Sequence, residues 1–353
     1  MPFLFLHPNY LFMDKNDFQP ISEIGFPKLI EKFEKYKGAE ISNVIKGIGD
    51  DSAVFKTDED KLNLLSSEIF LEGVHFDLTY HPFKHLGYKV VTSAVSDIYA
   101  MNGIPSQLLV DVALPNAYSV QMVEQFYEGL EAACKDYGIQ LTGGDTTASH
   151  QLLAIAVTSF GTVEKDKISY RSGAENSDAV CVSGDLGAAL AGLRILMREK
   201  KEWKEKGEDS FQPDLGKYEY VVSKQLVPAA RKDIIELFYE NNIKPSSMID
   251  VTQGLISDIR SIASSSGLGV QLHSPAVPIM LDTRNVADEM AEDVDKYAFY
   301  GGEDFELLFT LNENEVNTFS KVCDDFTVIG KMTNEFDQIK INTGENKTIE
   351  IDV

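Results

Sequence analysis

The sequence predicts a mixed α/β fold (α/β, or α+β) that is divided into two domains. The chain has 353 residues, enough for two domains of about 100–200 residues each. Segments with strand-like alternation and segments with helical periodicity follow one another in both halves, which favours layered helices and sheets in each half. A polar run near residues 164–172 marks the boundary. We therefore expect an N-terminal domain over 21–166 and a C-terminal α/β domain over 167–353.

The first half contains alternating helices and strands. Helical periodicity covers residues 21–36, 84–101 and 118–137. Apolar or alternating runs predict strands over 62–71, 107–114, 139–142 and 152–163. Residues 1–20 are expected to be a disordered or non-native extension, because their apolar start lacks the basic region and cleavage site of a signal peptide.

The second half repeats this mixture. It predicts strands over 178–183, 247–251, 326–331, 337–341 and 347–351, with a further strand inside 301–310. Helices are predicted from Gly184 to about Arg198 and over 218–226, 229–241, 255–265 and 312–323. The charged residues 200–217 are expected to form a mobile loop with solvated charges.

Composition narrows the possible partners. The net charge of −24 argues against nucleic acid, because phosphate backbones require basic patches. A small anionic substrate is still possible, provided that metal ions bridge the negative protein and the negative substrate. The cysteines Cys134, Cys181 and Cys323 are far apart, which suits a reducing cytoplasm and offers neither a disulfide framework nor a zinc site. No segment approaches the ~20 apolar residues of a membrane span.

Residues 47–55, Gly-Ile-Gly-Asp-Asp-Ser-Ala-Val-Phe, carry the first candidate site. Glycines allow a sharp turn or a close approach to a ligand, and the adjacent carboxylates of Asp50 and Asp51 concentrate negative charge that a cation would relieve. Oxygen ligands of this kind suit Mg²⁺, which commonly accompanies nucleotide phosphates. The alternative is a solvated turn before a strand.

Further polar residues stand where apolar ones are expected. The predicted strand 62–71 contains Ser66-Ser67-Glu68, and the apolar face of the predicted helix 84–101 carries Asp97. Buried polar groups need partners, so both suggest a binding site. The glycine-acid-hydroxyl run 143–147 suits a phosphate or metal-phosphate loop. His75 is either a packed or surface histidine or a ligand contact.

Six motifs together resemble the thiamine-monophosphate kinase family, within the superfamily of aminoimidazole ribonucleotide synthetase. They occur in the family's order over about residues 21–331, namely Gly47–Phe55, Glu72–Phe76, Ser96–Gly103, Gly143–Thr147, Tyr170–Gly173 and Gly301–Thr310. The resemblance implies transfer of the γ-phosphoryl group of ATP to thiamine monophosphate, directly and with several Mg²⁺ ions. It also implies a homodimer in which N-terminal strands of two subunits form a shared barrel, with ATP near that interface.

The resemblance also assigns residues by position. Metal ligands would be Asp51, Ser66, Ser67, Glu68, Asp97, Asp145 and Asp250, of which Asp51, Asp97 and Asp145 would be catalytic. ATP would contact Tyr127, Gly144, Asp145, Arg171 and Thr252, and the acceptor would contact His75 and Glu303.

Three departures from the family leave alternatives open. Glu68 stands where the family has Asp, Gln253 is neutral where the family has Asp, and the aromatic tail that stacks on thiamine is not found. A catalytically weakened or non-catalytic nucleotide-binding relative is one alternative. Another enzyme of the superfamily is the second, although selenophosphate synthetase would need an N-terminal cysteine and the hydrogenase-maturation member a C-terminal one.

Overall fold

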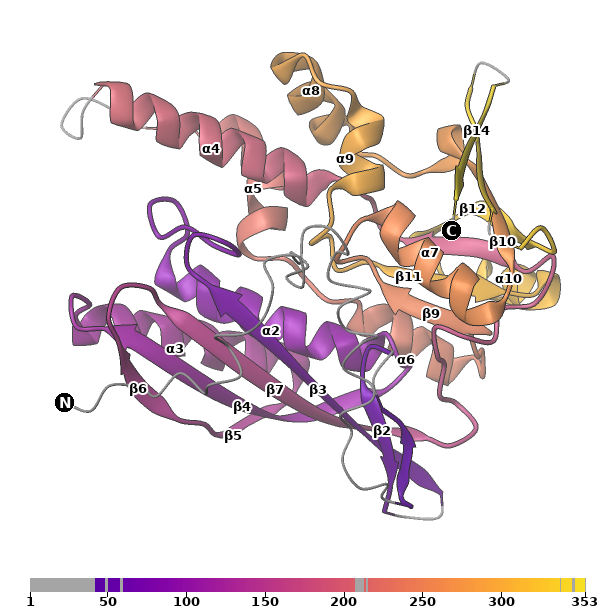
Figure 1. Cartoon of the computed structure of the whole chain (residues 1–353), viewed down its shortest axis with the longest axis horizontal. Helices are drawn as coiled ribbons and strands as arrows, with labels where there is room; N and C mark the ends of the chain where they lie inside the picture. The colour runs from indigo at the N-terminus through magenta and orange to yellow at the C-terminus, as the bar shows by residue number, and fades with distance from the viewer. Residues whose placement is uncertain are drawn as a thin grey trace, which may run out of the picture. The chain divides into compact units, whose positions relative to one another are not determined.

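The structure is a computed structural model that describes residues 42–47, 50–57, 60–206, 213, 215–336, 338–344 and 347–352. The predicted extension 1–20 and helix 21–36 lie outside the described residues, as do residues 207–212 of the predicted loop. Described residues from Ile45 onward belong to one compact unit. This unit contains two mixed sheets, each with its own helices (Figure 1).

The first sheet has the strand order β1-β2-β3-β7-β4-β5, and β6 also pairs with β4. Strand β4 runs parallel to β5 and β6, whereas β3 and β7 are antiparallel neighbours. The strands are β1 (Val44–Lys46), β2 (Ala53–Lys56), β3 (Lys61–Leu71), β4 (Ile104–Pro115), β5 (Gln140–Gly143), β6 (Thr146–Ser149) and β7 (Ala154–Glu164).

Two helices, α2 (Phe83–Tyr99) and α3 (Val120–Tyr137), cover one face of this sheet (Figure 1). They pack closely because glycines stand where their backbones approach, Gly87 on α2 and Gly129 on α3. Helix α2 also contacts β9 and α5 of the second half. Its residues from Lys89 to Tyr99 are therefore all buried, so any polar side chain there needs a partner within the protein.

The second sheet has the order β14-β13-β10-β12-β8-β11-β9. Alternate residues of its central strands point to opposite faces. Phe309 of β11 packs against Phe238 and Phe319 on one face, whereas Leu308 packs with the α7 side of the core on the other. The strands are β8 (Ala179–Ser183), β9 (Ser247–Asp250), β10 (Gly269–His273), β11 (Leu307–Leu311), β12 (Phe326–Thr333), β13 (Gln338–Asn342) and β14 (Thr348–Asp352).

Seven α-helices are described in this half: α4 (Ala188–Lys206), α5 (Glu219–Leu226), α6 (Lys232–Glu240), α7 (Leu255–Ser266), α8 (Leu281–Met290), α9 (Val294–Tyr300) and α10 (Glu313–Phe319). The predicted loop 200–217 is wrong in its first part, because α4 continues to Lys206. The added residues are rich in Lys and Glu, which are good helix formers.

The mixed two-domain fold is confirmed, because both halves combine sheet and helix and match the same superfamily architecture. The boundary predicted between residues 166 and 167 falls in the connection from β7 to β8 and stays a prediction, as does a barrel shared between subunits. Neither sheet closes on itself among the described strands. No helix in the described ranges is both long and apolar enough to cross a bilayer.

Candidate active site

The site is built around a polar stripe on the buried helix α2. Ser93, Ser96 and Asp97 are spaced three and four residues apart, which places them on one side of the helix. The stripe faces β3, and it also meets β9 where that strand ends at Asp250. Because α2 touches elements of both halves, these side chains meet residues that are far away in the sequence.

Three carboxylates converge at this stripe. Asp51 lies just before β2, Asp97 on α2 and Asp250 at the end of β9, and one oxygen from each lies within 4.8 Å of the others. Their side chains are nearly buried, with residue exposures of 9%, 9% and 2%. The structure thus brings together three of the four aspartates on which the sequence-based site depends.

Serine hydroxyls fix the orientation of these acids. Ser66 Oγ of β3 donates to Asp97 Oδ2, and Ser96 Oγ donates to Asp250 Oδ2. On the same face of β3, Glu68 Oε2 accepts from Ser93 Oγ. The polar triplet predicted inside an apolar strand is therefore partnered by the polar residues of α2, at least through its first and last members.

The buried acids repel one another. Burial raises the pKa of Asp97 well above its usual range, and Glu68, Asp250 and Asp51 add to that shift. Burial also raises the pKa of Asp250, with Asp51 as the next cause. Neighbouring carboxylates that resist ionisation together are stabilised by a bound cation. The donor set of carboxylate and hydroxyl oxygens fits a hard cation such as Mg²⁺.

Arg171 provides a positive charge at the edge of the cluster. Its Nε and Nη2 donate to the two oxygens of Asp51 at 2.9 and 2.8 Å, which is a bidentate contact. Its backbone N–H donates to Asp50 Oδ1 at 3.3 Å. Burial nevertheless raises the pKa of Asp50, and Asp51 contributes in the same direction. The Arg171 side chain is 27% exposed, so it can also reach a ligand.

The structure also contains a hollow of about 740 Å³, within the usual size range of small-molecule sites, about 300–1,000 Å³. His75 and Glu303 both line it. His75 Nδ1 accepts the backbone N–H of Leu71 at 3.0 Å, which assigns the proton of the neutral ring to Nε2. Glu303 is also close enough to Glu68 to raise the pKa of that group, after the larger effect of burial.

Glu303 is held in an uncommon backbone conformation. Its φ is +58°, in the left-handed region that residues other than glycine rarely adopt. The buried Lys89 of α2 donates to Glu303 Oε2 at 3.0 Å and to the carbonyl of Gln225 at 3.1 Å. Such locally unfavourable conformations cluster at functional sites, and the contact with Lys89 aligns the carboxylate along one wall of the hollow.

Comparison with known proteins relates the sequence of this chain to a family. Residues 49–163 match the AIR synthase related protein, N-terminal domain, and residues 176–341 match the C-terminal domain of the same description. Thiamine-monophosphate kinase of Aquifex aeolicus is 31% identical over 312 residues, covering 88% of this chain and 92% of the relative. That of Bacillus subtilis is 31% identical over 282 residues, covering 80% and 82%.

The chain belongs to the thiamine-monophosphate kinase family.

Solved structures agree with this membership. AaThiL complexed with AMPPCP and TMP has a TM-score of 0.79 at 28% identity, covering 95% of this chain and 99% of that one. Hydrogenase maturation protein HypE of Escherichia coli, at 15% identity and a TM-score of 0.65, covers 93% and 96% and shares the fold alone. The thiamine-monophosphate kinase fold therefore extends over both sheets of the chain.

Two predicted metal ligands, Asp145 and Ser67, lie away from Asp51, Asp97 and Asp250. Asp145 lines a shallow depression with Ile69 and Asp111, on the face of the first sheet opposite to α2. Its backbone N–H donates to Asp111 Oδ1 at 2.6 Å. Ser67 is exposed on that same face and accepts from Thr158 Oγ1 at 3.3 Å. Within one chain, Asp145 and Ser67 are thus separated from the other predicted metal ligands.

The other predicted ATP contacts, Gly144, Tyr127 and Thr252, lie on three different segments of the chain. Gly144 has φ +149°, and a Cβ there would lie 1.8 Å from the Val110 carbonyl, so only glycine fits. Tyr127 is half-buried against Phe126 on α3. Thr252 follows β9, and its carbonyl accepts the backbone N–H of Glu303 at 3.1 Å. Thr252 therefore links the segment after Asp250 to the wall of the hollow.

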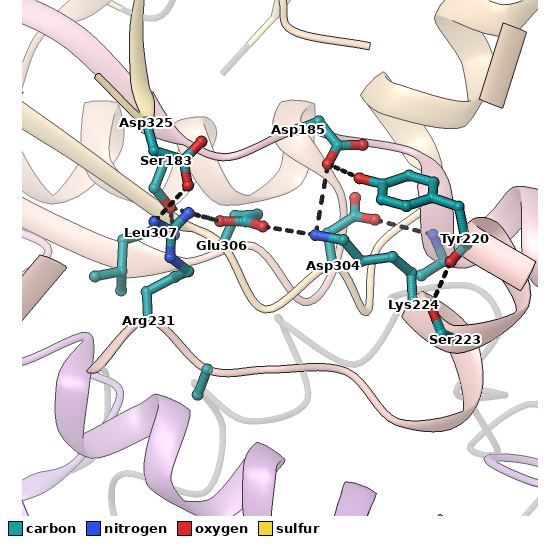
Figure 2. A network of polar contacts seen from close by, with 12 residues as sticks. Ser183, Asp185, Tyr220, Ser223, Lys224, Arg231, Asp304, Glu306, Leu307 and Asp325 are labelled. Atoms are coloured by element: carbon teal, nitrogen blue, oxygen red, sulfur yellow. Dashed lines mark hydrogen bonds and ion pairs between the residues drawn. The ribbon is translucent and has the colours of Figure 1, made fainter. Parts of the chain in front are cut away.

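A second polar network holds Asp304 and Glu306, which follow Glu303 in the sequence. Figure 2 shows it running from Arg231 through Glu306 and Lys224 to Asp185. Arg231 Nη1 donates to Glu306 Oε2 at 2.7 Å and Lys224 Nζ to Glu306 Oε1 at 3.1 Å. Asp304 accepts the backbone N–H groups of Gly187 and Ala189 at 2.9 and 3.2 Å. These contacts tie residues 303–306 to the start of α4.

Sequence reasoning missed several residues of the site, namely Lys89, Ser93, Ser96 and Asp258. Ser93 and Ser96 had a usable signal, because they lie four and one residues before Asp97 in an otherwise apolar helix. Asp258 accepts the backbone N–H of Gln253 at 3.1 Å. Burial raises the pKa of Asp258 to about 7, which adds another acid to this region.

Proposed function

We propose that this chain transfers the γ-phosphoryl group of ATP to thiamine monophosphate, giving thiamine diphosphate and ADP. The observation that carries the proposal is the meeting of Asp51, Asp97 and Asp250, in a protein whose hollow is lined by the predicted acceptor contacts His75 and Glu303. The chain belongs to a family whose members are named for this activity, and a relative is complexed with AMPPCP and TMP. Both substrates are anionic, so a site rich in carboxylates requires cations between its carboxylates and the substrate phosphates.

The predicted ligands suit Mg²⁺. Asp51, Asp97 and Asp250 would hold the ions, with Ser66 and Glu68 contributing from β3. Bound Mg²⁺ supplies charge neutralisation and alignment for phosphoryl transfer. The chain's own contribution is to hold the oxygens ready, since Ser66 and Ser96 fix the orientation of Asp97 and Asp250 before any ligand arrives.

The nucleotide and the acceptor take different sides of the cluster in this proposal. Arg171 would contact the ATP phosphates from the edge next to Asp51, as it does Asp51 itself. Thr252, Gly144 and Tyr127 are the further proposed ATP contacts. The acceptor would enter the hollow, where His75 Nε2–H is available as a donor and Glu303 as an acceptor. No covalent intermediate with the chain is required.

A homodimer would complete the site. The face of the first sheet opposite to α2 exposes Leu65, Ile69 and Leu109, at 40%, 58% and 45%. Exposed apolar sheet faces mark interaction surfaces, and Asp145 and Ser67 lie on this same face. We infer that two copies pair through it, as the predicted shared barrel requires. Sedimentation at micromolar concentration is expected to give a dimer, and a monomer would contradict this arrangement.

The departures from the family pattern alter metal binding without removing it. Glu68 has one more methylene than the family's Asp, yet its carboxylate reaches Ser93 on α2 and lies near the cluster. Gln253 is exposed after β9 and leaves one metal position with a neutral side chain. We therefore propose an active enzyme with a raised Mg²⁺ requirement. We place it in the cytoplasm, where its three buried, free cysteines remain reduced.

The test is product identification with the purified full chain. ATP, Mg²⁺ and thiamine monophosphate should give equal amounts of ADP and thiamine diphosphate by chromatography. Asp97→Asn should lower kcat by about a hundredfold or more. Asp136→Asn, the same change on the exposed surface of α3, should leave turnover unchanged. ATP consumption without thiamine diphosphate, or no reaction with the wild-type chain, would reject the proposal.

A further inference from the structure

The hollow lined by His75 and Glu303 contains a corner with a lysine–carboxylate pair that none of the predicted roles uses. Asp77, Tyr80 and Lys200 line it together with His75 and Glu303. Lys200 Nζ forms an ion pair with Asp77 Oδ2 and lies 5.8 Å from the centroid of the Tyr80 ring. An ammonium group between a carboxylate and an aromatic face is a favourable arrangement for a cation.

The corner is rigidly built. Asp77 Oδ1 accepts the backbone N–H of Thr79 at 2.9 Å, and the Asp77 carbonyl accepts those of Tyr80 and His81 at 3.1 and 2.9 Å. His81 is only 1% exposed, so it anchors the end of the turn in the protein interior. The turn 77–81 therefore holds a carboxylate and an aromatic ring in place, whereas the cation comes from a separate element, α4.

Two carboxylates lie near Tyr80, in a hollow that Lys201 and Lys204 line together with Lys200. Burial raises the pKa of Tyr80, and Asp77 and Glu303 add to the shift. Burial alone would raise the pKa of Asp77, but Lys200 and Thr79 hold it below its usual range. The carboxylate thus stays ionised, and two acids flank one aromatic ring. Glu303 connects this corner to Glu68 at the carboxylate cluster.

The proposed acceptor carries two groups of opposite charge, a phosphate and a cationic thiazolium ring. The phosphate must reach the carboxylate cluster and its cations. Glu303, Asp77 and Tyr80 line the same hollow, so a molecule whose phosphate lies near Glu303 can place its other end toward Asp77 and Tyr80. The inference that follows rests on the proposed function, because that function supplies the cationic ring.

We propose that Asp77 and Tyr80 bind the cationic ring of the acceptor, and that Lys200 occupies this position until the acceptor displaces it. Lys200 has a long, flexible side chain on α4 that is 21% exposed, so it can swing away. Asp77 then exchanges one cation for another and is never left unpaired. Lys200 is a competitor of the acceptor in this arrangement.

The direction in which one substitution changes the KM for thiamine monophosphate tests this proposal directly. Lys200→Met should lower the KM for thiamine monophosphate about two- to fivefold, the size of a lost cation–π contact at a partly exposed site. The KM for ATP and kcat should stay unchanged. Lys135→Met, which breaks an exposed pair with Glu131 on α3, is the matched control. A higher or unchanged KM for the acceptor in Lys200→Met would overturn the inference, since Lys200 would then bind the phosphate or nothing.

The ring is tested separately. Tyr80→Phe keeps the aromatic face and should change the KM for the acceptor by less than about twofold, whereas Tyr80→Leu should raise it about fivefold or more. Equal effects of the two variants would mean that the hydroxyl matters and not the ring. Thermal melting of each variant shows that it folds.

Thiamine without phosphate separates this inference from the proposed function. Calorimetry should show that Lys200→Met binds thiamine more tightly than the wild-type chain, whether or not either protein turns over thiamine monophosphate. If the wild-type chain makes thiamine diphosphate but Lys200→Met and the wild-type chain bind thiamine equally, the inference fails and the function stands. If turnover is absent and tighter binding is seen, the function fails and the corner remains a site for the cation.

Discussion

Asp97→Asn should make the metal-free protein more stable while it removes activity. The Asp97 carboxylate lies within 4.8 Å of oxygens from Asp51 and Asp250. At an effective dielectric constant of about 20, one like-charge pair at that distance repels by ~3.5 kcal/mol. Arg171 offsets the charge of Asp51, and partial protonation relieves part of the rest. We therefore expect a gain of about 1–3 kcal/mol in the free energy of unfolding at pH 8.

The gain should also depend on pH in a defined direction. The folded-state pKa of Asp97 is raised, first by burial and then by Glu68, Asp250 and Asp51. A raised pKa means that the wild-type protein loses stability as pH rises through the folded-state value. The amide side chain of the variant cannot ionise, so its advantage should be larger above the folded-state pKa of Asp97 than near the ordinary aspartate value of 3.8. The amide oxygen can still accept the hydrogen bond from Ser66, which limits structural damage.

The assay is urea unfolding in EDTA, followed by circular dichroism at pH 6, 8 and 9. Asp136→Asn is the control, because its exposed side chain should give no comparable gain. If Asp97→Asn loses more than about 1 kcal/mol, the carboxylate stabilises the fold and the stripe on α2 is structural. A gain that is equal at these three pH values and also at pH 4 would show that like-charge repulsion is not its cause.

Three further predictions concern other parts of the molecule. Gln253→Asp should lower the Mg²⁺ concentration for half-maximal activity, and an unchanged Mg²⁺ titration would show that this position binds no metal. Gly129→Ala should lower the free energy of unfolding in urea by at least about 2 kcal/mol, because its Cβ would lie 1.9 Å from the Lys84 carbonyl oxygen. A loss below about 1 kcal/mol would mean that α2 and α3 can move apart to make room. Glu306→Gln should cost about 3 kcal/mol, since it removes a buried partner of Arg231, and adding Arg231→Met should recover part of that loss in thermal melting.

Much of the fold was predictable because its signals are local. The alternation along 62–71 and the apolar positions of 84–101 depend only on which faces are buried, and the structure places β3 and α2 there. Helices α8 and α9 and strand β10 are among the elements that were missed. Residues 281–300 carry many acids between their apolar residues, so helical periodicity is hard to detect there.

The candidate site was predictable only in part. Asp97 stood out because a carboxylate on an apolar helix face needs a partner, but its actual neighbours come from distant segments of the chain. The hydrogen bond from Ser96 to Asp250 spans 154 positions, and no local pattern encodes it. Asp145 belongs to one of the six motifs that follow the order of the family. In the structure, however, it lies on the face of the first sheet opposite to α2. Chain order alone does not tell which side of a sheet a residue faces.

The bidentate contact between Arg171 and Asp51 has a consequence for how ligands enter. The chain carries its own counter-ion on one member of an acidic cluster, so that carboxylate is already partly neutralised before any cation binds. A metal ion held by Asp51 would compete with the guanidinium, and Arg171 would then be free to contact a polyphosphate. Under the proposed function, metal binding and nucleotide binding would each favour the other, and by linkage the affinity for either ligand should rise by the same factor when the other is bound.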